Sequence, residues 1–259
     1  MRIITQIISD YIGIIRVCGI FVATKWLLFI LLRLPECIKQ KNLQPADKMF
    51  GEGPIKVKTK YGQTYLLGDQ IFSSIREIWV RNVYLKNDFI QIPDSGLVVD
   101  LGANIGSFTI LALGNSPKCK VISVEPNLEL NELFWQQIKY NNFIDRVTLH
   151  RLFLGSISIK QDGMLKDPNS MEAKFISQQE FIDLNNLKKI DFLKCDIEGS
   201  EFEFIEDISL LEITDQLAIE IHDFAGDRNK FISKLIELGF RIGPIKNDPG
   251  GCILLAKKN

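Results

Sequence analysis

The chain has 259 residues, which fits one large domain or one domain with an extension, and its 31 Lys and Arg nearly balance its 32 Asp and Glu. This balance produces no field that would attract a polyanion, and no DNA- or RNA-binding motif is present, so we expect no nucleic-acid partner. The five cysteines are odd in number and form no C-x-x-C pair, which argues against a disulfide framework and favours the reducing cytoplasm.

The first segment, residues 3–34, is mostly aliphatic and aromatic, and Arg16, Lys25 and Arg33 are its main charges. It lacks the single apolar stretch and small-residue cleavage site of a signal peptide. Its uncharged runs are far shorter than the ~20 residues of a membrane-spanning helix. Three alternatives stay open: the segment packs on the rest of the protein or on a second copy, lies on a membrane surface, or spans it.

Residues 34–54 contain repeated Pro and Gly, so this stretch is predicted to be a linker between the apolar helical segment (1–54 with the linker) and the main domain at 55–259. Within that domain, 55–59 and 63–67 flank Tyr61-Gly62 and are typical of a hairpin. Apolar spacing over 71–84 predicts a helix. We expect residues 55–96 to cap a core formed by 97–259.

From residue 97 onward, short apolar runs alternate with helical patterns, which predicts a parallel sheet covered by helices on both faces. The predicted fold class is therefore α/β, with a Rossmann-like doubly wound sheet. The chain should end in an antiparallel hairpin at the sheet edge, and 155–171 should be a loop or short hairpin. The predicted strands are 97–101, 119–124, 147–150, 190–195, 216–221, 240–246 and 252–256; the predicted helices are 107–113, 128–140, 177–184, 201–208 and 228–238.

The most informative stretch is 98–108, V-V-D-L-G-A-N-I-G-S-F, in which a buried strand enters a glycine-bearing turn and then a helix. Ligands bind at such strand ends in doubly wound folds. A dinucleotide fingerprint would need glycine at Asn104 and Ser107, which weakens a nicotinamide-dependent reading. The candidate cofactor-binding residues here are Asp100, Gly102, Ala103, Asn104, Gly106, Ser107 and Phe108.

Two carboxylates favour a different cofactor. Asp100, at a strand end, would repel a pyrophosphate but suits the ammonium group of a methionine-derived cofactor. Glu125 follows Gly106 by nineteen residues and ends the next strand, where it can accept hydrogen bonds from two ribose hydroxyls. Pro126-Asn127 then begins the following helix. We therefore predict S-adenosyl-L-methionine as the cofactor, with Glu125, Pro126 and Asn127 completing its site.

Two further strand ends carry polar groups. Along 192–201, a period of two places Lys194, Asp196 and Glu198 on one side, either as a structural network or as substrate-orienting groups. At the next strand end, His222 has the titration range of a general base, although a lone histidine is often structural. Asp196, His222 and Glu198 are the candidate catalytic residues. Together with Glu220 they offer ligands for a magnesium-type ion, but their spacing is not a metal motif, so no metal site is assigned and metal dependence stays open.

These segments resemble the FkbM family of S-adenosylmethionine-dependent methyltransferases over about residues 84–224. The resemblance rests on D-x-G-A-N-x-G-S-F from Asp100, E-P-N from Glu125, K-x-D-x-E-G-x-E from Lys194 and E-x-H from Glu220. It implies a class I methyltransferase fold with seven strands, the last antiparallel, and O-methylation of sugars or natural products. Residues 177–181, S-Q-Q-E-F, depart from the family's leucine-aspartate pair.

The predicted function is methyl transfer to a hydroxyl of a small molecule or glycan, by positioning and proton removal. Two alternatives stay open. One is a nicotinamide-dependent oxidoreductase, and the other is a non-catalytic, membrane-associated scaffold that keeps the fold. The resemblance does not extend to residues 3–34.

Overall fold

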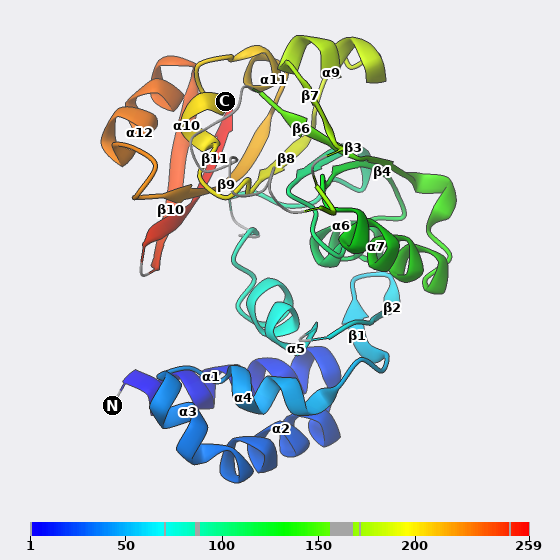
Figure 1. Cartoon of the computed structure of the whole chain (residues 1–259), viewed down its shortest axis with the longest axis vertical. Coiled ribbons are helices and arrows are strands. Elements are labelled where there is room, and N and C mark those ends of the chain that lie inside the picture. Colours follow the sequence, from blue (N-terminus) through cyan, green and yellow to red (C-terminus); the bar gives the residue numbers. More distant parts are fainter. Residues whose placement is uncertain are drawn as a thin grey trace.

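The computed structural model describes residues 2–69, 71–85, 89–155, 168–170, 172–248 and 250–258. A unit of N-terminal helices lies below an α/β domain in Figure 1, and the segment around α5 and the β1–β2 hairpin joins the two. The N-terminal unit comprises helices α1 (Arg2–Cys18), α2 (Ile20–Leu32), α3 (Leu34–Gln40) and α4 (Gln44–Asp47), followed by the 3₁₀ turn η1 (Lys48–Phe50).

The stretch predicted as a linker, 34–54, is largely helical, so that prediction is wrong for α3, α4 and η1. Pro35 and Pro45 each lie in the first turn of a helix, where a proline has no hydrogen bond to break and its fixed φ favours helix initiation. Proline therefore marks two helix starts here. Gly19 separates α1 from α2 at φ 95°, a conformation that favours glycine.

The N-terminal helices pack on the α5–η2 segment, which comprises α5 (Ile71–Ser74) and the π-helical turn η2 (Ile75–Val80). Arg76 bridges two buried carboxylates: its Nη1 donates to Asp10 Oδ2 at 2.9 Å and its Nε to Asp47 Oδ1 at 3.0 Å. Trp26 Nε1 also donates to Asp47, at 2.9 Å. Of the three sequence alternatives, packing on the rest of the protein is the one seen. No helix among the described residues is long and apolar enough to cross a bilayer.

The main sheet has the strand order β10-β11-β9-β8-β3-β4-β5. Neighbouring pairs from β9 to β5 are parallel, and β11 is antiparallel to both β9 and β10. This confirms the predicted class I methyltransferase fold with its terminal antiparallel hairpin. The strands are β3 (Ser95–Leu101), β4 (Lys118–Val124), β5 (Val147–His150), β8 (Phe192–Cys195), β9 (Gln216–His222), β10 (Phe240–Asp248) and β11 (Gly251–Lys258).

Helices cover both faces of the sheet (Figure 1), and the strand side chains alternate between two apolar cores. Val98 packs in one core with Phe108, whereas Val99 packs in the other with Leu193. The first core continues into the N-terminal helices. The covering helices are α6 (Ser107–Gly114), α7 (Leu128–Tyr140), α9 (Gln178–Asn185), α10 (Glu201–Phe204), α11 (Ser209–Glu212) and α12 (Arg228–Glu237).

Two small sheets complete the fold. The hairpin β1 (Ile55–Thr59) and β2 (Gly62–Leu66) packs on α6 and α7, so it covers a helical layer beside the main sheet. Strands β6 (Leu152–Leu154) and β7 (Lys174–Ile176) pair in parallel. Most of the predicted 155–171 loop lies outside the described residues. The helix predicted at 201–208 is instead α10 and then α11, because Asp207 accepts from Ser209 N at 3.1 Å and starts a new turn.

Candidate functional site

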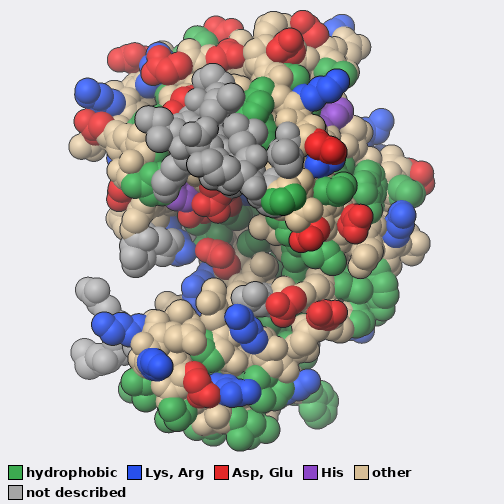
Figure 2. Space-filling view, viewed as in Figure 1, with side chains coloured by type: hydrophobic (Ala, Val, Ile, Leu, Met, Phe, Trp, Pro, Cys, Tyr) green, Lys and Arg blue, Asp and Glu red, His purple; other side chains and the backbone are tan. Residues whose placement is uncertain are grey.

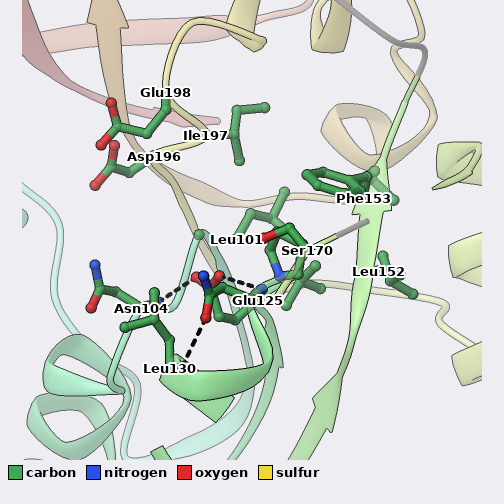
Figure 3. Close-up of a pocket in the computed structure, with 15 residues that line it drawn as sticks. Leu101, Asn104, Glu125, Leu130, Leu152, Phe153, Ser170, Asp196, Ile197 and Glu198 are labelled. Carbon is green, nitrogen blue, oxygen red and sulfur yellow. Dashed lines mark hydrogen bonds between the residues drawn. The ribbon is translucent and has the colours of Figure 1, made fainter. Parts of the chain in front are cut away.

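A cavity opens at the carboxyl ends of β3, β4 and β8, where the chain order reverses between β3 and β8 (Figure 3). Seven of the predicted site residues line it: Gly102, Asn104, Glu125, Pro126, Asn127, Asp196 and Glu198. The remaining lining residues are Leu101, Val124, Leu130, Leu152, Phe153, Leu154, Ser170 and Ile197. In Figure 3, Asp196 and Glu198 lie together on one side and Phe153 lies across from them.

The glycine turn after β3 is held between its two neighbouring strands. The amides of Gly102 and Ala103 both donate to Val124 O, at 3.0 and 2.9 Å. Gly102 has φ 72°, and a Cβ there would collide with the carbonyl of Asp196, so only glycine fits. Ala103, Gly106, Ser107 and Phe108 do not line the cavity but build the turn and the start of α6. These residues therefore support the cavity wall from behind.

Glu125 is almost fully buried in the cavity wall (Figure 3). Its Oε2 accepts from Asn104 N and its Oε1 accepts from Asn127 N, each at 2.9 Å. Burial raises the pKa of this carboxyl above its usual value, and the two amides act against that rise. Each carboxylate oxygen has a second lone pair, so Glu125 can still accept two hydrogen bonds from a ligand.

Asp100 does not line the cavity, because its side chain is fully buried beneath the turn. Its Oδ2 accepts from Thr109 Oγ1 at 2.7 Å, and its Oδ1 lies 3.3 Å from Lys194 Nζ. Lys194 also donates to Gly102 O at 2.6 Å. Burial lowers the pKa of Lys194, but the charges of Asp100 and Asp196 outweigh this effect and raise it. The structure thus pairs Asp100 with a lysine from β8.

Tyr84 joins two carboxylates that are distant in sequence. Its hydroxyl lies 3.2 Å from Asp196 Oδ2 and 3.4 Å from Glu220 Oε2. Burial, together with the charge of Asp196, raises the pKa of Glu220 to about 7. Sequence reasoning missed Tyr84, because it lies in the segment before the core and no local pattern links it to β8 or β9. Its ring packs edge-on against Phe108, at 5.6 Å between centroids.

His222 does not line the cavity itself, but its Nε2 lies 3.7 Å from Glu198 Oε2, and Glu198 does line it. The Nδ1 of His222 lies 3.0 Å from Oε1 of the fully buried Glu201. Burial raises the pKa of Glu201, while the amide of Gly199 and the imidazole lower it. Glu198 itself has φ 54°, a strained conformation for a residue of its type. Sequence reasoning quoted Glu201 in a motif but assigned it no role.

An apolar wall faces the carboxylates across the cavity. Leu152, Phe153 and Leu154 form β6, and the Phe153 ring stacks on Phe175 of β7 at 4.6 Å between centroids. These three residues were not among the site residues predicted from the sequence. A three-residue strand carries too little periodicity to be recognised, although the run L-F-L directly after a predicted strand is a signal that could have been used.

Acidic side chains line the inner wall of the hollow between the N-terminal unit and the α/β domain (Figure 2). Asp196 and Glu198 line the cavity of the site, and the negative charges of Asp196 and of Glu77 in η2 contribute to raising the pKa of the nearby Glu220. In the described part of the chain, no group of three or more His, Cys, Asp or Glu side chains is arranged to hold a metal ion. The site therefore consists of a cavity with a buried carboxylate, Glu125, in its wall and a histidine-carboxylate pair, His222 and Glu201, beside it.

The chain is similar in sequence to known methyltransferases. The profile of the Methyltransferase FkbM domain matches residues 100–242. "Methyltransferase 1" of Beauveria bassiana is 24% identical over 208 residues, covering 67% of this chain and 82% of that protein. "Hexuronic acid methyltransferase AglP" of Haloferax volcanii is 25% identical over 183 residues, covering 63% and 73%. The structure of the Methanococcus jannaschii fibrillarin pre-rRNA processing protein is 13% identical, with 82% and 84% coverage and a TM-score of 0.48.

Proposed function

The chain belongs to the FkbM methyltransferase family, an S-adenosylmethionine-dependent family, and we propose that it methylates a hydroxyl of a sugar, glycan or natural product. When bound, the cofactor supplies an electrophilic methyl group on a sulfonium centre. The nicotinamide alternative finds no support in the matched family. The protein's own residues must hold the cofactor, orient the acceptor hydroxyl and remove its proton.

The residues around the cavity suit this cofactor. Glu125 has free lone pairs at the cavity wall and fits a ribose diol, and Phe153 offers an apolar surface that fits an adenine ring. The turn from Gly102 to Asn104 brings backbone close to the ligand without a side chain in the way at Gly102. We propose that Asp100 acts through Lys194 and the turn, since its carboxylate is buried beneath them.

The observation that carries the proposal is the pair formed by Glu201 and His222. With Nδ1–H donating to Glu201 at 3.0 Å, the lone pair of Nε2 is left as a proton acceptor. This is the arrangement of a general base held in one tautomer by a buried carboxylate. We propose that Asp196, at the cavity wall and 3.2 Å from the Tyr84 hydroxyl, orients the acceptor hydroxyl.

The charge of the hollow bears on the acceptor. Asp196 and Glu198 present carboxylates at the cavity wall, so an anionic acceptor would meet repulsion, whereas a neutral or cationic sugar would not. The Haloferax volcanii relative is named for a hexuronic acid, which supports a sugar acceptor in general. We propose a neutral or amino-bearing sugar hydroxyl for this chain. Its five free cysteines fit the reducing cytoplasm, where we place the reaction.

A binding measurement and an acceptor screen test the proposal. S-adenosylmethionine and S-adenosylhomocysteine should raise the melting temperature, whereas NAD and NADP should not. A panel of neutral, amino and uronic sugars, with simple amines for comparison, is then screened for S-adenosylhomocysteine release, and NMR locates the new methyl group. Methyl transfer to nitrogen alone, or uronic acids as the best acceptors, would contradict the proposal.

A further inference from the structure

We propose that this protein docks on the surface of an anionic lipid bilayer through an outward apolar face of α2 and α3. The face comprises Ile20, Phe21, Leu28, Leu31, Leu32, Leu34 and Ile38, and we call it the α2–α3 face. Figure 2 shows hydrophobic side chains with interspersed basic ones along the lower side of the molecule, over the N-terminal helices. This binding function is separate from methyl transfer.

The exposure of this face is unusual for the molecule. Of the eighteen large hydrophobic side chains that are exposed among the described residues, ten lie in the first 38 positions. Phe21 is 89% exposed, and Leu31 and Ile38 are each 68% exposed. Soluble surfaces carry single exposed hydrophobic residues without consequence, but a concentrated patch marks a surface that contacts something apolar.

Helix α2 is apolar on both sides, so packing against the rest of the protein buries only one of its two apolar sides. Its inner side buries Ala23, Trp26 and Ile30, which recur at helical spacing and face the core. Its outer side repeats the pattern with Phe21, Leu28 and Leu32, all exposed. A helix that is apolar all round is normally enclosed by protein or lipid, so the outer side lacks a partner within the described chain.

The charges around the face indicate what that partner is. From residue 4 to 54, the exposed basic side chains are Arg16, Lys25, Arg33, Lys39, Lys41 and Lys48, against only Glu36 and Glu52 at the surface. The other two acidic residues of the segment, Asp10 and Asp47, are buried and paired with Arg76. The outer surface of this unit is therefore positive, although the whole chain carries a net charge of −1.

This charge selects a lipid surface over a second copy of the chain. A symmetric dimer would bring two positive faces together, which costs free energy, whereas anionic headgroups neutralise Lys and Arg beside an inserted apolar face. Lys25, the one charge within α2, does not interrupt the face: its Nζ lies 5.3 Å from the ring centroids of both Phe29 and Phe50, back toward the core. The combination of an apolar face with flanking basic groups is that of an interfacial helix.

The length of α2 suits a helix that lies on a bilayer surface and does not span it. The 13 residues of α2 extend about 20 Å at 1.5 Å per residue, less than the ~30 Å of a hydrocarbon core. Helices α2 and α3 lie on the side of the N-terminal unit away from the α/β domain, so docking leaves the catalytic cavity clear of the bilayer (Figure 1). The acceptor site would then face the water layer next to the membrane.

Vesicle co-sedimentation of the full chain tests this proposal. Binding should be strong to vesicles of phosphatidylcholine and phosphatidylglycerol in equal parts and at least tenfold weaker to phosphatidylcholine alone. The double variant Phe21→Glu/Leu31→Glu should lower the partition coefficient for anionic vesicles at least tenfold. A separate charge variant, Lys39→Glu/Lys41→Glu, should lower it by a similar factor while leaving the apolar side chains in place.

The matched control is Leu184→Glu, which introduces the same charge at a leucine that is 61% exposed on α9. Its partition coefficient should stay within twofold of wild type. S-adenosylhomocysteine affinity, measured on every variant, reports folding and separates this proposal from the methyltransferase assignment. Absence of vesicle binding, equal binding to neutral vesicles, or a dimer by light scattering that Phe21→Glu/Leu31→Glu converts to monomer would each overturn it.

Discussion

Two clusters of buried charge lie in this protein, and they are built differently. In the first, Arg76 lies between Asp10 and Asp47 with side chains 7%, 1% and 0% exposed, and every carboxylate oxygen has a hydrogen-bond donor. In the second, Lys194 lies between Asp100 and Asp196, but Asp100 Oδ1 has no aligned hydrogen bond and Asp196 is 23% exposed at the cavity. Each cluster thus has one cation between two aspartates. We call the first closed, because all its carboxylate oxygens are hydrogen-bonded and buried, and the second open, because one oxygen lacks an aligned hydrogen bond and Asp196 reaches the cavity.

The difference indicates what each cluster is for. A buried charge is costly unless fully paired, so a closed cluster serves to hold two parts of the chain in one arrangement. The second cluster leaves Asp100 Oδ1 without an aligned hydrogen bond and exposes Asp196 at the cavity, and Asp196 shares the Tyr84 hydroxyl with Glu220, whose pKa is raised. Buried groups with raised pKa values beside a cavity are features of chemical sites. The comparison can be tested by removing members of each cluster.

The largest effect is expected beside the cavity that the open cluster borders, for His222→Ala. We expect kcat to fall ~10²–10⁴-fold, because the variant removes the proposed general base. Affinity for S-adenosylhomocysteine should stay within a few-fold, measured by calorimetry, since His222 does not line the cavity. His150→Ala is the control, because that histidine contacts Asn185 and lies at β5. An unchanged rate in His222→Ala would remove histidine from the mechanism.

In the closed cluster, Arg76→Ala should lower the free energy of unfolding by about 3–5 kcal/mol, measured by urea denaturation. The cause is the uncompensated burial of Asp10 and Asp47. Arg81→Ala is the matched comparison: Arg81 also pairs with Asp10, but its side chain is 31% exposed, so we expect a clearly smaller loss. Equal losses for the two variants would mean that full enclosure is not what makes the cluster structural.

The carboxylate at the cavity wall should affect binding more than folding. Glu125→Ala should weaken S-adenosylmethionine binding by about 1.5–3 kcal/mol, because it removes a charge-assisted acceptor of hydrogen bonds. Glu129→Ala, on the exposed side of α7, serves as the control and should bind normally. Calorimetry that found native affinity in Glu125→Ala would place the ribose elsewhere.

Asp100→Ala should weaken cofactor binding and also lower the free energy of unfolding, because it leaves Lys194 buried without its main partner.

The smallest effect concerns the pH dependence of stability. The fold raises the pKa of Glu220 from 4.5 to about 7, so it disfavours the ionised form, and stability present below pH 4.5 is lost as the pH rises toward 7. Relative to wild type, Glu220→Gln should therefore gain about 1 kcal/mol at pH 8 compared with pH 4, a modest amount because solvent screens a half-buried group. Exposed Glu237→Gln should show no such gain. A flat difference across pH would contradict the raised pKa.

Local sequence patterns determined much of the α/β domain. Short continuous apolar runs with intervening helical spacing predicted the strands and helices of the main sheet, because a central parallel strand is covered on both faces and a covering helix is apolar on one. The turn at Gly102 and the strand-end carboxylate of Glu125 were also visible, since a glycine fingerprint and its spacing are properties of one short segment. The cofactor family followed from these segments and from the motifs at Lys194 and Glu220.

Tertiary structure decided the remainder, because it depends on which distant segments meet. Tyr84 reaches Asp196 and Glu220 only through the docking of η2, and Glu201 becomes the partner of His222 only when α10 packs beside β9. The same applies to Arg76, whose two carboxylate partners come from separate N-terminal helices. The spacing of apolar residues along a helix or strand indicates which of its faces is buried. It does not indicate which other element covers that face, because that depends on packing between segments that are distant in sequence.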